Sequence, residues 1–112
     1  MNEITREILR QVSDFTGEFS GAYNIREDGL CAGRMSTDHI HITSKEDKPG
    51  LDIRVDPGTV GESVSIPACV THGDVDDLVY NDFFIGAGAD VVIVAGCGVH
   101  TSNGEPARHN GI

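Results

Sequence analysis

The sequence predicts a mainly β fold in which one N-terminal helix is followed by short strands that lead into parallel β-helix (solenoid) rungs. Helical periodicity is confined to the first residues, and from residue 20 onward turn signals recur roughly every 8–12 residues. The chain has 14 glycines, no tryptophan, two tyrosines and four phenylalanines. This composition suits tight turns and not a helical bundle, because glycine inside a helix costs about 1 kcal/mol relative to alanine.

The helix is expected at residues 2–15, and residues 1–19 are expected to form an amphipathic helix and linker that precede a β-rich domain at 20–112. One apolar face of helical spacing is formed by Ile4, Ile8, Leu9, Val12 and Phe15. Asn2 can cap the first amides and Gly17 can end the helix. We expect the apolar face to pack on the β domain, with a partner-binding helix as the alternative.

Four strands are expected where residues alternate with period two, at 23–25, 39–43, 51–55 and 62–66. They are separated by turn residues, namely Asp28-Gly29, Pro49-Gly50 and Asp56-Pro57-Gly58. These short strands and their turns predict an all-β arrangement after the helix.

The segment 77–95 contains two strongly apolar runs on either side of the small-residue corner at 86–90. We expect such apolar strands to be covered on both faces or to lie inside a stack. A corner of Gly, Ala and Asp between short strands is typical of β-solenoids, which need about three repeats to bury their ends. Residues 108–112 contain no stop signal, so we read the chain as the N-terminal portion of a longer protein or as a short stand-alone relative.

Length and charge exclude several classes of protein. The 112 residues allow one domain, and 8 basic against 18 acidic residues give a net charge of −10. Such a chain repels nucleic acid and anionic lipid, and no apolar run approaches the roughly 20 residues of a membrane span. The charged N-terminus is not a secretory signal, so a cytoplasmic location is expected.

The three cysteines do not form an even disulfide framework, and two of them belong to repeated Cys-x-x-His pairs. The pairs are Cys69 with His72 and Cys97 with His100. A turn at the neighbouring glycines would bring thiolate and imidazole onto one ion, and these are ligands of zinc and of soft iron sites. His109 and Cys31 are possible further donors. The alternative is that both thiols are small core residues and the histidines lie at the surface.

Other candidate motifs are weaker. His39 and His41 share one strand face, which can chelate a metal or can be a solvated face. The acidic residues Asp74, Asp76, Asp77 and Asp82 do not match a calcium loop. The chain also has no complete dinucleotide-binding glycine motif and no nucleophile elbow.

Three segments resemble the SufB/SufD family of iron–sulfur cluster assembly proteins, in particular its shorter archaeal and bacterial relatives. They are GAYNIREDG (21–29), VYNDF (79–83) and AGCGVH (95–100), the last followed by HNGI (109–112). The resemblance implies a SufBD-like parallel β-helix core and pairing with a SufB/SufD-like partner or in a homodimer. It also implies a SufC-like ABC ATPase as partner, although this chain is much shorter than a full family member.

The resemblance implies thiolate and imidazole ligands for an iron–sulfur cluster or iron. It points first to Cys97 and His100, which lie in the matched segment. Cys69, His72 and His109 follow on spacing. On this reading the chain is a scaffold that binds a transient cluster, and not an enzyme.

Two other functions remain open. One is a small zinc metalloenzyme in which Cys97, His100 and His72 hold the ion and Asp74 or Glu105 acts as the acid or base. The other is a metal-free module whose exposed β edge pairs with another copy.

Overall fold

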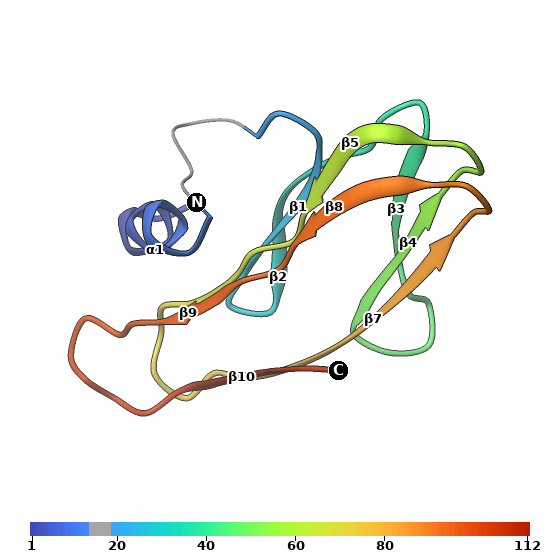
Figure 1. Ribbon diagram of the computed structural model, residues 1–112. Helices are drawn as coiled ribbons and strands as arrows, with labels where there is room; N and C mark the ends of the chain where they lie inside the picture. Colours follow the sequence, from blue (N-terminus) through green and yellow to red (C-terminus); the bar gives the residue numbers. More distant parts are fainter. Residues whose placement is uncertain (14–18) are drawn as a thin grey trace.

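The fold is mainly β, as predicted. The computed structural model describes residues 1–13 and 19–112, and in that part it has one helix and ten strands (Figure 1). The helix is α1 (Glu3–Ser13). The strands are β1 (Ala22–Glu27), β2 (Leu30–Met35), β3 (Ile40–Ser44), β4 (Gly50–Val55), β5 (Val60–Ser65), β6 (Ala68–Val70), β7 (Asp76–Ile85), β8 (Asp90–Val94), β9 (Cys97–Val99) and β10 (Arg108–Gly111).

The strands form two sheets. The first is a curled sheet in the order β8-β5-β1-β6-β9, whose pairs are parallel, and β2 joins β1 as an antiparallel hairpin. The second sheet has the order β10-β7-β4-β3 and is mixed, because β3 and β4 are antiparallel while the other pairs are parallel. The final red strands therefore lie at the edges of both sheets (Figure 1).

Several parallel pairs in both sheets are separated by a similar length of chain, whereas β1 lies 42 positions before its partners in β5 and β6. Gly50 pairs with Tyr80 and Val60 pairs with Asp90, a spacing of about 30 positions. The connecting turns are also bonded to each other, because the Gly58 amide donates to the Ala87 carbonyl at 2.9 Å.

A first apolar core lies between the sheets, and a second lies under the helix. The first consists of Ala22, Ile40, Ile42, Leu51, Ile53, Val55, Val64 and Ile66. In the second, Ile8 and Leu9 of α1 pack with Ile25 and Cys69. α1 lies over β6 and β9 and packs against Ile25 of β1, so from Tyr23 to Arg26 that strand turns apolar side chains toward the helix and polar ones inward.

Gly50 is required where β4 begins. Its φ of +146° lies outside the range that L side chains favour, and an added Cβ would overlap the carbonyl of Tyr80. The close approach lets β4 pair with β7 from its first residue, Gly50, onward.

The helix begins as expected from its cap. The Asn2 side-chain oxygen accepts a hydrogen bond from the Thr5 amide at 2.8 Å. The observed helix, Glu3–Ser13, lies inside the predicted range 2–15. Phe15 and Gly17 lie outside the described residues, and no helix in the described chain is long and apolar enough to cross a membrane.

The four strands expected from alternation are confirmed as β1, β3, β4 and β5, with shifts of at most two residues at their ends. Four further strands, β2, β6, β9 and β10, were not predicted. The expectation that the apolar strands near the C-terminus are covered is wrong for this chain: Val92 of β8 is 62% exposed and Phe84 of β7 is 45% exposed. The reason is that β8 forms a sheet edge.

Candidate functional site

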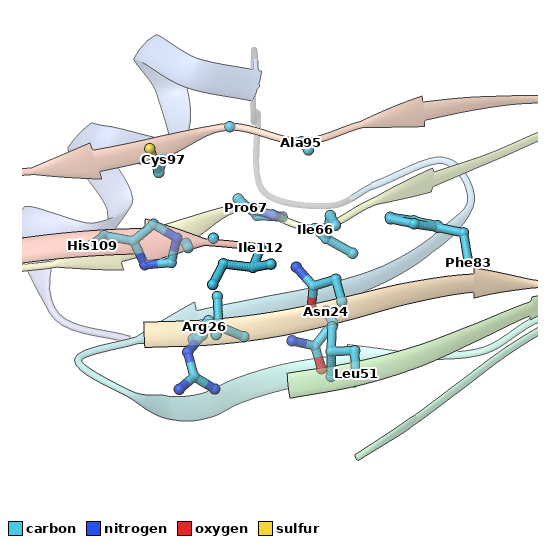
Figure 2. Close-up of a pocket in the computed structure, with 15 residues that line it drawn as sticks. Asn24, Arg26, Leu51, Ile66, Pro67, Phe83, Ala95, Cys97, His109 and Ile112 are labelled. Atoms are coloured by element: carbon cyan, nitrogen blue, oxygen red, sulfur yellow. The ribbon is translucent and has the colours of Figure 1, made fainter. Parts of the chain in front are cut away.

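A pocket of about 380 Å³ opens between the two sheets, beside the edge formed by β9 and β10 (Figure 2). Its walls are mostly apolar, with Leu51, Ile66 and Val79 among them. Its polar lining residues are Asn24, Arg26, Asn81, Cys97 and His109. An apolar pocket with a few convergent polar groups is the usual form of a ligand site.

β1 supplies two of these polar groups because of its inverted polarity. Asn24 and Arg26 alternate with Tyr23 and Ile25, which pack under α1. Asn24 is only 3% exposed. The polar face of β1 therefore points into the interior, because its apolar face packs under the helix.

His109 is held by a buried hydrogen bond to a carboxylate. Its Nδ1 lies 3.0 Å from Oδ2 of Asp77, and the side chains are 8% and 3% exposed. Arg26 donates to the same carboxylate, with Nη2 at 2.7 Å from Oδ1 and Nε at 2.9 Å from Oδ2. A carboxylate at Nδ1 fixes the ring and leaves Nε2 for a ligand, which is the usual outer-shell arrangement around a metal-binding histidine.

Asp77 is charged despite its burial. Burial alone works to raise the pKa of Asp77, but the hydrogen bonds from Arg26 and His109 outweigh it and hold the pKa below its ordinary value. The carboxylate is therefore available as an acceptor for the imidazole across the neutral pH range.

The two repeated thiols face opposite sides of the first sheet. In the β6–β9 pair, Ala68 is opposite Cys97 and Cys69 is opposite Gly98. Side chains alternate along a strand, so a shift of one position reverses the face. Cys97 lines the pocket and is exposed, whereas Cys69 is fully buried under α1.

The environment of Cys69 suppresses its ionisation. Burial, together with the nearby charges of Glu27 and Asp28, raises the pKa of the Cys69 thiol to about 11. Since metals and electrophiles react with the thiolate, Cys69 behaves here as a small apolar core residue.

The histidines of the two pairs also lie apart from the pocket. His72 is exposed and its Nδ1 lies 2.8 Å from Oδ2 of Asp28. His100 is exposed too, and neither residue lines the pocket. The structure thus brings Cys97 and His109 to one pocket but does not bring the two Cys-x-x-His pairs together.

Among the described residues, no group of three or more His, Cys, Asp and Glu side chains is close enough to hold a metal ion. The one-position shift between the pairs is the physical reason that the Cys69 and Cys97 thiols do not meet. Ligation by Cys97 and His109 stays a prediction, as does any role of the other three residues.

His39 and His41 are engaged separately. His39 Nδ1 lies 2.7 Å from Glu62, and His41 Nε2 lies 3.1 Å from Asp56. The Glu62 hydrogen bond raises the pKa of His39 above its ordinary value. This arrangement corresponds to the solvated strand face, not to a chelating pair.

Sequence reasoning missed Arg26, Asn81 and Asp77 as site residues. Asp77 was visible only as one of several acidic residues, although it lies two positions before the apolar Val79 and so shares its inward face. Asn81 continues the same alternation, and its buried Oδ1 has no hydrogen-bond partner in the described structure.

Comparison with known proteins gives no match: no family model fits the chain, and neither curated proteins nor solved structures show a significant similarity. The relation to the SufB/SufD family therefore rests on the sequence segments and remains a prediction.

Proposed function

We propose that this chain is a scaffold component for iron–sulfur cluster assembly, of the SufB/SufD type, and not an enzyme. The observation that carries the proposal is that the Cys97 thiol and the His109 imidazole line one partly apolar pocket. Thiolate and imidazole suit iron and its clusters. The iron or nascent cluster is the cargo of this pocket and not a resident cofactor.

The geometry of His109 supports the choice of this histidine over His100. Asp77 contacts the His109 ring at Nδ1, and Arg26 in turn holds the Asp77 carboxylate, so Nε2 is left for a ligand. His100, although closer to Cys97 in sequence, is exposed and outside the pocket. Cys97 and His109 are therefore the proposed first ligands, and a cluster needs further ligands from solvent, cargo or a partner chain.

The finer fold that we propose is the start of a parallel β-helix. Pairings about 30 positions apart recur from β4 to β7, from β5 to β8 and from β6 to β9. The bonded turns at Gly58 and Ala87 follow the same spacing. Equal spacing in both sheets is what successive coils of a solenoid produce.

The exposed sheet edge at β8 favours the binding of a partner chain, which the family resemblance also implies. Phe83 and Ile93 pair with the buried Ile53 and Val64, so they lie on the inward face, yet they are 38% and 39% exposed. A second copy or a SufB/SufD-like partner against β8 would cover them. A SufC-like ATPase partner is proposed from the resemblance alone, as is a cytoplasmic location.

Anaerobic reconstitution with ferrous iron and sulfide tests the cargo. We expect a visible charge-transfer band with matching iron and sulfide content in the wild type, and its loss in Cys97→Ser. Cys31→Ser is the matched control, because Cys31 is also exposed but lies outside the pocket. Equal loading of the two variants would refute the assignment.

The histidine assignment has its own control. His109→Gln should weaken iron loading, whereas His100→Gln should leave it unchanged. Thermal unfolding of both variants shows whether the loss reflects misfolding, since His109 also contacts Asp77. Bound zinc with hydrolase activity, in place of iron with labile sulfide, would favour the metalloenzyme instead.

A further inference from the structure

A second pocket, of about 220 Å³, lies between the β1–β2 hairpin and the turn that joins β3 to β4. The chain has only 8 basic residues against 18 acidic ones. The basic residues that line this pocket are Arg26, Arg34, Lys45 and Lys48. None of its described lining residues is Asp or Glu, so the pocket is a basic site on a strongly acidic protein.

Two of the four cations are neutralised by carboxylates just outside the pocket. Arg26 pairs with Asp77, and Lys45 pairs with Asp52 and Asp82. The hydrogen bonds from Lys45 hold the pKa of Asp82 below its ordinary value, with a smaller effect from the charge of Lys48. These pairs fix the frame of the pocket, and because Lys45 meets two carboxylates the paired groups together carry one negative charge.

Arg34 is held in place by neutral groups. Its Nε donates to Oδ1 of Asn24 at 2.7 Å, and its Nη2 donates to the hydroxyl of Ser44 at 2.9 Å. Asn24 is itself 3% exposed, so the guanidinium is anchored from the protein interior. In the described structure Arg34 has no carboxylate partner, which leaves its charge uncompensated.

Lys48 is the other cation without a salt bridge in the described structure, and its charge offsets the excess negative charge at Asp82, so Arg34 carries the net positive charge of the pocket. The Lys48 ammonium lies 4.9 Å from the centre of the Tyr80 ring, an arrangement that keeps the charge available. The pocket is also small: at about 30 Å³ per water in the liquid, it has room for a tetrahedral anion and several waters.

We propose that this basic pocket binds a small phosphate-type oxyanion, either inorganic phosphate or a phosphomonoester. The planar guanidinium of a pre-positioned arginine matches the spacing of phosphate oxygens, and a lysine adds a mobile charge. Ser44 and Gly50 also line this pocket. This site does not depend on the metal cargo proposed above, although the two pockets share Asn24, Arg26 and Leu51.

Titration of the full chain at low ionic strength tests the proposal, with ¹H–¹⁵N spectra as the readout and inorganic phosphate or glycerol phosphate as the probe. We expect saturable shifts for Arg34 Nε–H and for the Ser44 and Gly50 amides. Tighter binding of glycerol phosphate would identify an esterified ligand, and equal or tighter binding of inorganic phosphate would identify the free anion. An absence of saturable shifts with both probes overturns the proposal.

Arg34→Gln should weaken binding at least about tenfold, because a hydrogen bond to a charged group is lost. Arg6→Gln is the matched control, since it removes the same charge from an exposed position on α1 and should change the affinity less than about twofold. Equal weakening in both variants would show a non-specific charge effect and refute the site. Lys48→Gln, at an exposed position, repeats the test if Arg34→Gln does not fold.

Discussion

Cys69 faces Gly98 across the β6–β9 pair, so it lies one register position away from facing Cys97. This single position separates a buried core thiol from a thiol that lines a pocket. The repeated Cys-x-x-His spacing is therefore not a repeated structural site, and the two cysteines should differ in their chemistry.

Thiol reactivity should divide the three cysteines into two groups. Cys31 and Cys97 are exposed, whereas Cys69 is buried and the pKa of its thiol is raised to about 11. We expect two thiols to react quickly with a disulfide reagent near pH 8 and the third to react only after denaturation. Rapid reaction of all three in the native protein would contradict the buried position of Cys69.

Asp77→Asn should destabilise the protein by about 3 kcal/mol, because it leaves the Arg26 charge buried without its partner. Asp76→Asn is the control: the neighbouring carboxylate is 71% exposed and lies 3.9 Å from an exposed Arg108, so its loss should cost well under about 1 kcal/mol. Urea unfolding of both variants gives the comparison. Similar midpoints would show that the Asp77 pair contributes no more than a surface pair.

Stability should fall at acid pH, in part through Asp28. Burial works to raise the pKa of Asp28, but hydrogen bonds from Thr71 and His72 outweigh it and hold the pKa below its ordinary value. The unfolded chain therefore binds this proton more readily than the folded one. The stability that Asp28 contributes is present above its unfolded pKa near 4 and is lost as the pH falls through the lower folded pKa.

Asp28→Asn should flatten this part of the pH profile of unfolding. Asn tolerates the left-handed backbone at this position, where φ is 50°. Asp74→Asn is the control, since Asp74 has a similar φ of 69° but is exposed. A profile that Asp28→Asn leaves unchanged would show that the Thr71 contacts do not depend on the charge.

Gly50→Ala should disrupt the start of β4 far more than Gly58→Ala disrupts its turn. Both glycines have positive φ, but a Cβ on Gly50 would overlap the Tyr80 carbonyl, whereas a Cβ on Gly58 meets nothing within 4 Å. We expect Gly58→Ala to cost about 1–2 kcal/mol and Gly50→Ala to cost more. Thermal unfolding measures both losses of stability. Equal losses would show that the positive φ alone, and not the overlap with Tyr80, causes the destabilisation.

The local parts of this fold are predictable because local patterns determine them. The stripe from Ile4 to Leu9 and the alternation at 39–43 and 51–55 each identify their own element. The short strands β6 and β9 carry no such pattern, since three residues are too few to show a period. Their existence follows from pairing with strands that are distant in sequence.

The candidate site is less predictable, because it depends on register. His109 and Asp77 are 32 positions apart in sequence and are brought together by the β7–β10 pair. The local sequence around Cys69 and Cys97 also does not show that the two cysteines differ by one position in the β6–β9 register. Long-range register is set by the whole stack of strands and not by any one motif.

The reversed polarity of β1 makes α1 indispensable to the rest. Removing the helix would leave Ile25 and Cys69 facing water, since Ile8 and Leu9 are their cover. A protein without α1 would expose Cys69 as a third oxidisable thiol. It would also expose an apolar surface at Ile25 that favours aggregation. Shortened versions made for crystallisation should therefore start at Met1 and keep α1.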